Sequence, residues 1–151
     1  MVSTWADFQA AQRSALAALV AGDPRDYQRL WEHSPGVSLL GAFGGVAHGW
    51  DEVRDRLAAV AVTYGNGVYR RLDQLDEHVH GDTAWTVHVE EIHSWTAAGE
   101  RQVRERRVTK VYRRGADGWR IVHMHSDPLV TTAFPDADGD VENGRPAPSP
   151  G

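Results

Sequence analysis

The chain has 151 residues, 41% of them hydrophobic and 25% charged, which is typical of one globular domain. Its formal net charge of −5 argues against the basic surface that nucleic-acid binding requires, and the lack of cysteine excludes disulfides and thiolate sites. Residues 1–20 lack the pattern of a signal peptide, and no apolar run is long enough for a bilayer. We therefore expect a cytoplasmic protein without a membrane or nucleic-acid partner.

Two helices are predicted near the N-terminus. Apolar residues at helical spacing begin after a possible cap at Ser3 or Thr4 and end before Gly22, which predicts the first helix. Asp23 and Pro24 are typical of a helix start, and they predict a short second helix that ends at Pro35.

A hairpin and a third helix are predicted next. Val37–Phe43 and Val46–His48 are short apolar runs, and the two glycines between them can adopt the positive φ angles of a tight turn. Trp50–Ala61 then repeats apolar residues at helical spacing and stops before Gly65, so this third helix should lie across a sheet.

The second half of the chain predicts an antiparallel meander, because its strand-like runs are separated only by short turns. These runs are Val68–Val79, Thr83–Trp95, Gln102–Arg113 and Trp119–His125. Residues 135–151 are rich in Pro, Gly, Asp and Ser, so we predict a domain over 1–134 followed by a flexible tail. Helices before strands predict the α+β class: three helices on a strongly curved, mainly antiparallel sheet that forms a cone-shaped barrel with a pocket.

Strand register determines which residues share a face of this sheet. Pairing about residue 100 places Glu90 opposite Lys110 and His88 opposite Tyr112, and the last two strands are paired about Ala116. One face then holds His88, Glu90, Ile92, Val108, Lys110, Tyr112, Val122 and Met124. The other holds Trp85, Val87, Val89, Glu91, Thr109, Val111, Trp119, Ile121, His123 and His125.

The second of these faces is the more apolar. Large exposed apolar patches are uncommon on monomers, so we expect a homodimer that forms through this outer sheet face. The arginine-rich run from Arg101 to Lys110 is interpreted as a solvated strand face, with a basic binding stripe as the alternative.

The last hairpin carries a family resemblance. Val108–Arg114 followed by Gly118–Ser126 is similar to the closing hairpin of SnoaL-like bacterial proteins and of the calcium/calmodulin-dependent kinase association domain. The same superfamily includes polyketide cyclases, ketosteroid isomerases and nuclear transport factor two, and the resemblance spans Trp5–Pro128. It implies a cone that binds a small hydrophobic molecule.

The resemblance also implies which face lines the cone. Pocket residues of the kinase association domains correspond to Tyr27, Val53, Glu90, Lys110 and Ser126. The relatives have a histidine at the position of Val53 and arginines at those of Glu90, Lys110 and Ser126, so this chain departs from their set. The face of His88, Glu90 and Lys110 should therefore point inward. The expected ligand-binding residues are Tyr27, Trp31, Val53, Leu57, Tyr112, Met124 and Ser126.

The expected catalytic residues are Glu90 as general base and Lys110 as proton donor or oxyanion stabiliser, with His88 beside them. A structural cross-strand salt bridge between Glu90 and Lys110 is the alternative. Tyr27 and Trp31 lie one helical turn apart and could stack on a ring-shaped ligand or pack in the core.

Two functions therefore remain open. One is an enzyme of the isomerase, cyclase or dehydratase kind that works without a metal or other cofactor; the other is a noncatalytic ligand-binding or oligomerisation module. His123 and His125 have a spacing that two metal ligands can have, but a structural role is preferred and no metal is expected. Ionisable groups in an apolar cone without a neutralising salt bridge would favour the enzyme, and a filled cone would favour the module.

Overall fold

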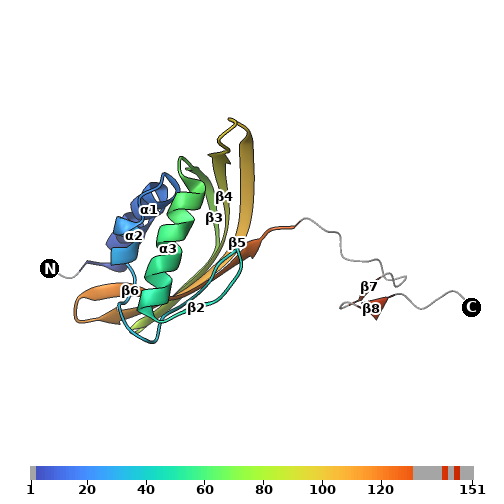
Figure 1. Ribbon diagram of the computed structural model, residues 1–151. Coiled ribbons are helices and arrows are strands. Elements are labelled where there is room, and N and C mark those ends of the chain that lie inside the picture. The colour runs from blue at the N-terminus through green and yellow to red at the C-terminus, as the bar shows by residue number, and fades with distance from the viewer. Residues whose placement is uncertain (1–2, 131–140, 143–144, 147–151) are drawn as a thin grey trace, which may run out of the picture.

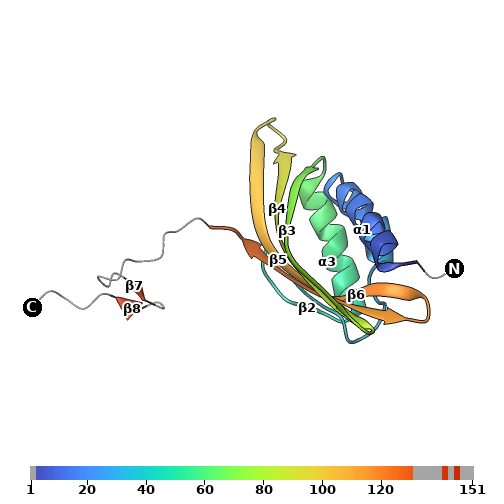
Figure 2. The ribbon, with the colours of Figure 1, turned by 180° about the vertical axis from the view of Figure 1, so that it is seen from behind.

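Three helices cover one side of a curved sheet. The computed structural model describes residues 3–130, 141–142 and 145–146. Helices α1 (Trp5–Val20), α2 (Arg25–Arg29) and α3 (Trp50–Tyr64) all lie on the side toward which the sheet bends (Figures 1 and 2). The α+β class and the three helices are thus confirmed.

The main sheet has six strands in the order β2-β1-β6-β5-β4-β3. They are β1 (Ser38–Leu40), β2 (Ala47–His48), β3 (Val68–His80), β4 (Thr83–Trp95), β5 (Arg101–Gly115) and β6 (Gly118–Pro128). Among the ladders between the described strands of this sheet, only that of β1 with β6 is parallel, which confirms a mainly antiparallel sheet. Among the described strands, no ladder joins the two edges β2 and β3.

The C-terminal segment contains a second, separate pairing. β7 (Val141–Glu142) pairs antiparallel with β8 (Arg145–Pro146). The rest of the predicted tail over 135–151, together with the predicted domain boundary at 134, lies outside the described residues.

Helix α1 begins at a capping box. The Thr4 hydroxyl accepts a hydrogen bond from the Asp7 backbone N–H, and the Asp7 carboxylate accepts one from the Thr4 backbone N–H. The buried side chains recur at helical spacing and include Phe8, Leu16 and Leu19. The first predicted helix is therefore confirmed, with its apolar stripe against the sheet.

Helix α2 is shorter than predicted: it ends at Arg29, whereas the prediction continued it to Pro35. Ile121 of β6 accepts a hydrogen bond from Glu32 and donates one to the Leu30 carbonyl, and Trp31 forms a parallel bridge with Ile121. The backbone N–H and C=O groups that another helical turn would need are thus hydrogen-bonded to β6 instead.

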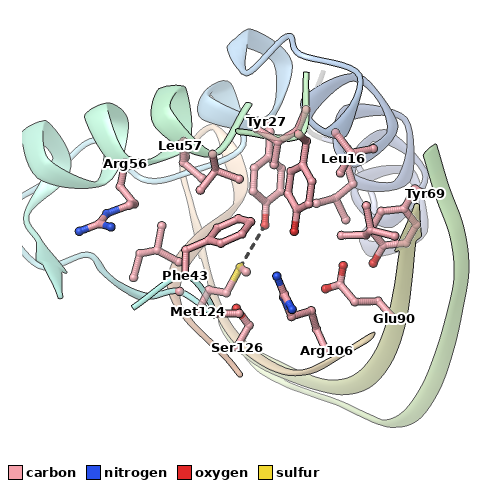
Figure 3. A pocket seen from close by; sticks show the side chains of 18 of the residues that line it. Leu16, Tyr27, Phe43, Arg56, Leu57, Tyr69, Glu90, Arg106, Met124 and Ser126 are labelled. Carbon is pink, nitrogen blue, oxygen red and sulfur yellow. Dashed lines mark hydrogen bonds between the residues drawn. The ribbon is translucent and has the colours of Figure 1, made fainter. Parts of the chain in front are cut away.

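The first hairpin is confirmed as an antiparallel pair, but its strands are shorter than the predicted runs. Residues 41–46 form a wide loop in which Gly44 and Gly45 have φ angles of 95° and 76°. Phe43 therefore leaves the strand and points toward the helices (Figure 3). Helix α3 follows as predicted and ends at Gly65, whose φ of 64° suits a glycine C-cap.

The register of β4 and β5 differs from the predicted one by four residues. Glu90 pairs with Arg106 and Thr86 pairs with Lys110, so Glu90 and Lys110 are not opposite each other. The connection is a five-residue loop over 96–100, with Gly99 near its end and not at its centre. Because the shift is even, each side chain keeps its predicted face.

Because β6 contains a β-bulge, some of its side chains lie on the opposite face from the one predicted. The pairing with β5 shifts between Val111 and Tyr112, and Val122 is the additional residue. Trp119 and Ile121 were predicted on the outer face, but both are buried in the main core cluster with Tyr112. The extra residue reverses the alternation, so Met124 and Ser126 still face inward.

No helix among the described residues is long and apolar enough to cross a membrane.

Candidate functional site

The space between the helices and the sheet contains two cavities. The first, of about 60 Å³, lies between α1, α3, the residue 41–44 loop and the sheet, and its walls are mainly apolar. The second, of about 400 Å³, lies between α1 and strands β3 to β5, and most of its lining residues have polar side chains. Leu16 of α1 lines both cavities and separates them.

Two charged side chains of opposite sign line the first cavity without contacting each other as an ion pair. Glu90 and Arg106 point from neighbouring strands toward Tyr27, with apolar side chains around them (Figure 3). Their residues are only 5% and 7% exposed. Over the described part of the chain, no ion pair of 4.0 Å or less joins them. Each charge is therefore placed to interact with a ligand in a poorly hydrated site.

The Glu90 carboxylate has one polar neighbour from its own strand. Its Oε1 lies 3.3 Å from Nε2 of His88, which is itself 3% exposed. Burial lowers the pKa of His88, and the hydrogen bond with Glu90 opposes this effect. A neutral His88 can donate its Nε2 proton to Glu90 and hold the carboxylate in position.

Arg106 is a charged pocket residue that the sequence interpretation missed. The run over 101–110 was interpreted as a solvated face, but Arg106 is buried, which makes that interpretation wrong at this position, while Lys110 is buried as its predicted inward face requires. The signal was present, since Arg106 lies four residues before Lys110 in one strand and therefore shares its face. The Arg106 guanidinium carbon lies 5.2 Å from the centre of the Phe43 ring.

Three tyrosines complete the first cavity. The Tyr27 hydroxyl donates to the Met124 sulfur at 3.5 Å, while the buried Tyr69 hydroxyl has no hydrogen-bond partner among the residues that the structure describes. Burial raises the pKa values of Tyr27, Tyr64 and Tyr69, so their hydroxyls remain protonated at neutral pH. An unpaired buried hydroxyl is a donor that a ligand could satisfy.

Lys110 lies at the second cavity instead of beside Glu90. Its Nζ donates to Oε1 of Gln12 at 2.8 Å and lies 5.2 Å from the centre of the Tyr27 ring. Burial lowers the pKa of Lys110 to about 8, and the charge of Glu90 opposes this effect. The alternative of a Glu90–Lys110 salt bridge is not realised, because no such pair lies within 4.0 Å in the described residues.

A buried hydrogen-bond network surrounds this lysine. The Tyr112 hydroxyl lies 3.1 Å from the Thr86 hydroxyl and 3.2 Å from Nε2 of Gln12. Gln12 and Thr86 were not anticipated from the sequence, and Gln12 occupies a polar position within an otherwise apolar helix stripe.

The predicted site residues are thus divided between two cavities. Five line the first cavity, namely Tyr27, Leu57, Glu90, Met124 and Ser126. Three line the second, namely His88, Lys110 and Tyr112. Trp31 and Val53 line neither and belong to the core cluster, where Trp31 packs edge-on against Tyr27 with 6.4 Å between ring centres.

The His-x-His pair lies on the outer face of the sheet. His123 Nδ1 is 2.7 Å from the Ser38 hydroxyl, and burial lowers the pKa of His123. In the described residues, no group of three or more His, Cys, Asp or Glu side chains is arranged to hold a metal ion.

Comparisons with known proteins give one family and a set of similar structures. The SnoaL-like domain matches residues 9–131, and no protein with a curated description matches the chain. A candidate dehydratase of the NTF2-like family from Streptomyces avermitilis is 22% identical, with a TM-score of 0.70 over 83% of this chain and 97% of that one. A candidate calcium/calmodulin-dependent protein kinase type II association domain from Thiobacillus denitrificans is 21% identical, with a TM-score of 0.69 over 86% and 98%.

An NTF2-like superfamily protein from Salmonella enterica serovar Typhimurium is also 21% identical, with a TM-score of 0.68 over 87% of this chain and 96% of that one. At these identities, the likeness shows the shared NTF2-like fold and nothing about the ligand.

Proposed function

The chain belongs to the SnoaL-like domain family, and we propose that it binds a small, mainly apolar molecule in the first cavity and acts on it by acid/base chemistry. One observation carries this proposal. Glu90 and Arg106 are buried in an apolar cavity without an ion pair between them, so neither charge is neutralised at short range by the other. Catalytic sites characteristically hold ionisable groups in such surroundings.

The two side chains suit removal of a proton from carbon. Glu90 is placed as a general base, and Arg106 from the neighbouring strand is placed to stabilise the negative oxygen that develops on the substrate. The unpaired Tyr69 hydroxyl is a second donor to that oxygen. Isomerases, cyclases and dehydratases share this kind of step, and one structural neighbour is a candidate dehydratase.

Nitroethane is a suitable probe because it is small, has an acidic carbon and cannot condense with an amine. We expect the protein to accelerate the exchange of its acidic hydrogens for deuterium, followed by NMR in D2O. Glu90→Gln should slow this exchange by about 10²-fold, since general base catalysis contributes at least that factor. Arg106→Gln should also slow it by about 10²-fold, because the nitronate oxygen loses its cation.

Glu91→Gln is the matched control. Glu91 follows Glu90 in β4 but faces the outer side of the sheet, where it pairs with Glu105 of β5 in the strand ladder. The control should exchange nitroethane at the wild-type rate. Equal rates for wild type and a folded Glu90→Gln variant would remove the proposal.

The outer face of the sheet supports a second candidate function, association with another copy of the chain. Trp85 is 37% exposed there and lies on the same face as Val87, Val89 and Val111. Two structural neighbours are association or hub domains of calcium/calmodulin-dependent kinases. Covering this apolar surface would stabilise a homodimer.

Sedimentation of matched variants tests the homodimer. Val87→Asp places a charge on the outer face and should give a monomer, whereas Val62→Asp on the exposed side of α3 should leave the wild-type mass unchanged. A wild-type chain that sediments as a monomer at micromolar concentration would exclude this candidate.

A further inference from the structure

The second cavity opens to solvent at one end and is closed by buried polar side chains at the other. Its rim includes Arg13, Gln74 and Glu77, which are exposed. Its floor consists of Thr86, His88, Lys110 and Tyr112, all 3% exposed or less. A molecule entering at the rim would therefore meet a wall of hydrogen-bonding groups.

Lys110 is the only lysine in the sequence, and it is 1% exposed on this floor. An ammonium group buried to this extent usually has a carboxylate beside it. Within the described chain, no carboxylate oxygen lies within 4.0 Å of Lys110 Nζ, and its hydrogen-bond partner is the neutral amide of Gln12. Burial therefore favours the neutral amine, while the charge of Glu90 and the face of the Tyr27 ring oppose this by favouring the ammonium.

The neutral form of Lys110 is populated near physiological pH. Its pKa is lowered to about 8 by burial, so about one tenth of the side chain is an unprotonated amine at pH 7. An unprotonated amine in a cavity that small molecules can enter is a nucleophile for carbonyl carbon.

We propose that Lys110 forms a Schiff base with a small polar aldehyde or ketone that enters through the second cavity. The neutral amine attacks the carbonyl carbon, a C–N bond forms as the π bond to oxygen breaks, and one proton passes from the nitrogen to the oxygen to give a carbinolamine. The nitrogen then gives up its second proton while the oxygen takes up a proton and leaves as water, and a C=N bond to Lys110 remains. One carbonyl compound and one amine are thus converted into one imine and one water, with no oxidant or reductant.

The side chains around Lys110 suit the proton transfers of this reaction. The Tyr112 and Thr86 hydroxyls are 3.1 Å apart, and Tyr112 and Lys110 both contact Gln12. A hydroxyl pair of this kind can donate to the carbinolamine oxygen as it leaves. The site does not use the first cavity, so this inference stands apart from the proposed base catalysis.

Reductive trapping with glycolaldehyde and sodium cyanoborohydride tests the proposal on the full chain. The reduced adduct adds a fixed mass to an amine, and peptide mapping separates Lys110 from the α-amino group, which serves as the internal reference. We expect Lys110 to be modified in the folded protein with a rate that saturates in aldehyde and rises with a midpoint near pH 8. Lys110→Arg should remove the adduct.

The rate of Lys110 modification in the unfolded chain distinguishes a reactive lysine from one that is buried and inaccessible to the aldehyde. In guanidinium chloride the pKa of Lys110 returns to its ordinary value, so its rate at pH 7 should fall at least about tenfold relative to the α-amino group. A hidden, unreactive lysine would instead become modified only on unfolding. That result would overturn the proposal.

Two matched substitutions test whether the aldehyde reaches Lys110 through the mouth of the second cavity. Gln74→Trp should block the cavity mouth and slow trapping at Lys110, while Gln102→Trp, at an exposed position of β5 outside the cavity, should leave it unchanged. Because both glutamines are exposed, both variants should fold. Equal trapping in the two variants would show that the cavity is not the route and would also overturn the proposal.

Discussion

The two cavities lie on the same inner face of one sheet, yet their walls differ in polarity. The first is covered by α3 and the C-terminal half of α1, which contribute residues such as Leu19, Leu57 and Val60. The second is covered mainly by the N-terminal half of α1, which contributes Gln9 and Gln12. The covering helices therefore decide the polarity of each cavity, while the sheet places ionisable groups in both.

The largest expected effect comes from removing the partition between the cavities. Leu16→Ala should lower the free energy of unfolding by about 2–5 kcal/mol, because Leu16 is 6% exposed and its loss joins two hollow spaces. Urea denaturation measures this. Leu75→Ala, at a position 65% exposed on β3, is the control and should stay within about 0.5 kcal/mol of wild type. A similar small loss for Leu16→Ala would mean that the partition contributes little.

A second prediction concerns how the buried charge of Lys110 makes the stability of the protein depend on pH. The pKa of Lys110 is about 8 in the folded protein and 10.5 ordinarily, so between these values the unfolded chain binds more protons and wild-type stability rises with pH. Lys110→Met removes this titration and should be more stable than wild type below pH 8. The difference should shrink by about 2–3 kcal/mol by pH 10.5. Denaturation at several pH values measures it, and a pH-independent difference would contradict the lowered pKa.

The smallest expected effect concerns the polar lining alone. Gln12→Leu should cost about 1–2 kcal/mol, because Lys110 loses its hydrogen-bond partner while Tyr112 keeps Thr86. Gln102→Leu at an exposed position is the control and should leave the unfolding free energy within about 0.5 kcal/mol. If Gln12→Leu proves as stable as wild type, the network does not stabilise the buried lysine.

Much of the fold could be predicted because its signals are local. The cap at Thr4, the stop at Gly65 and the turn glycines act within a few residues, and helical or alternating spacing shows which side chains are buried. The shared face of Glu90 and Lys110 could also be predicted, since a register error of an even number of residues leaves every side chain on its face. The family resemblance, and not the spacing, implied that this face points inward.

The candidate site was less predictable, because it depends on the register between neighbouring strands. The five-residue loop over 96–100 pairs Glu90 with Arg106 and moves Lys110 to a different cavity. A single extra residue at Val122 turns Trp119 and Ile121 inward. Neither loop length nor bulge position has a strong local signal.

The sequence by itself therefore determined the class of the fold, the order of its elements and which strand residues share a face, since caps, turns and periodicity act between near neighbours. Only the tertiary structure decided that Glu90 and Arg106 share an apolar cavity while Lys110 lies in a polar one. That outcome depends on packing between α1, α3 and the sheet, whose contacts join residues far apart in the chain.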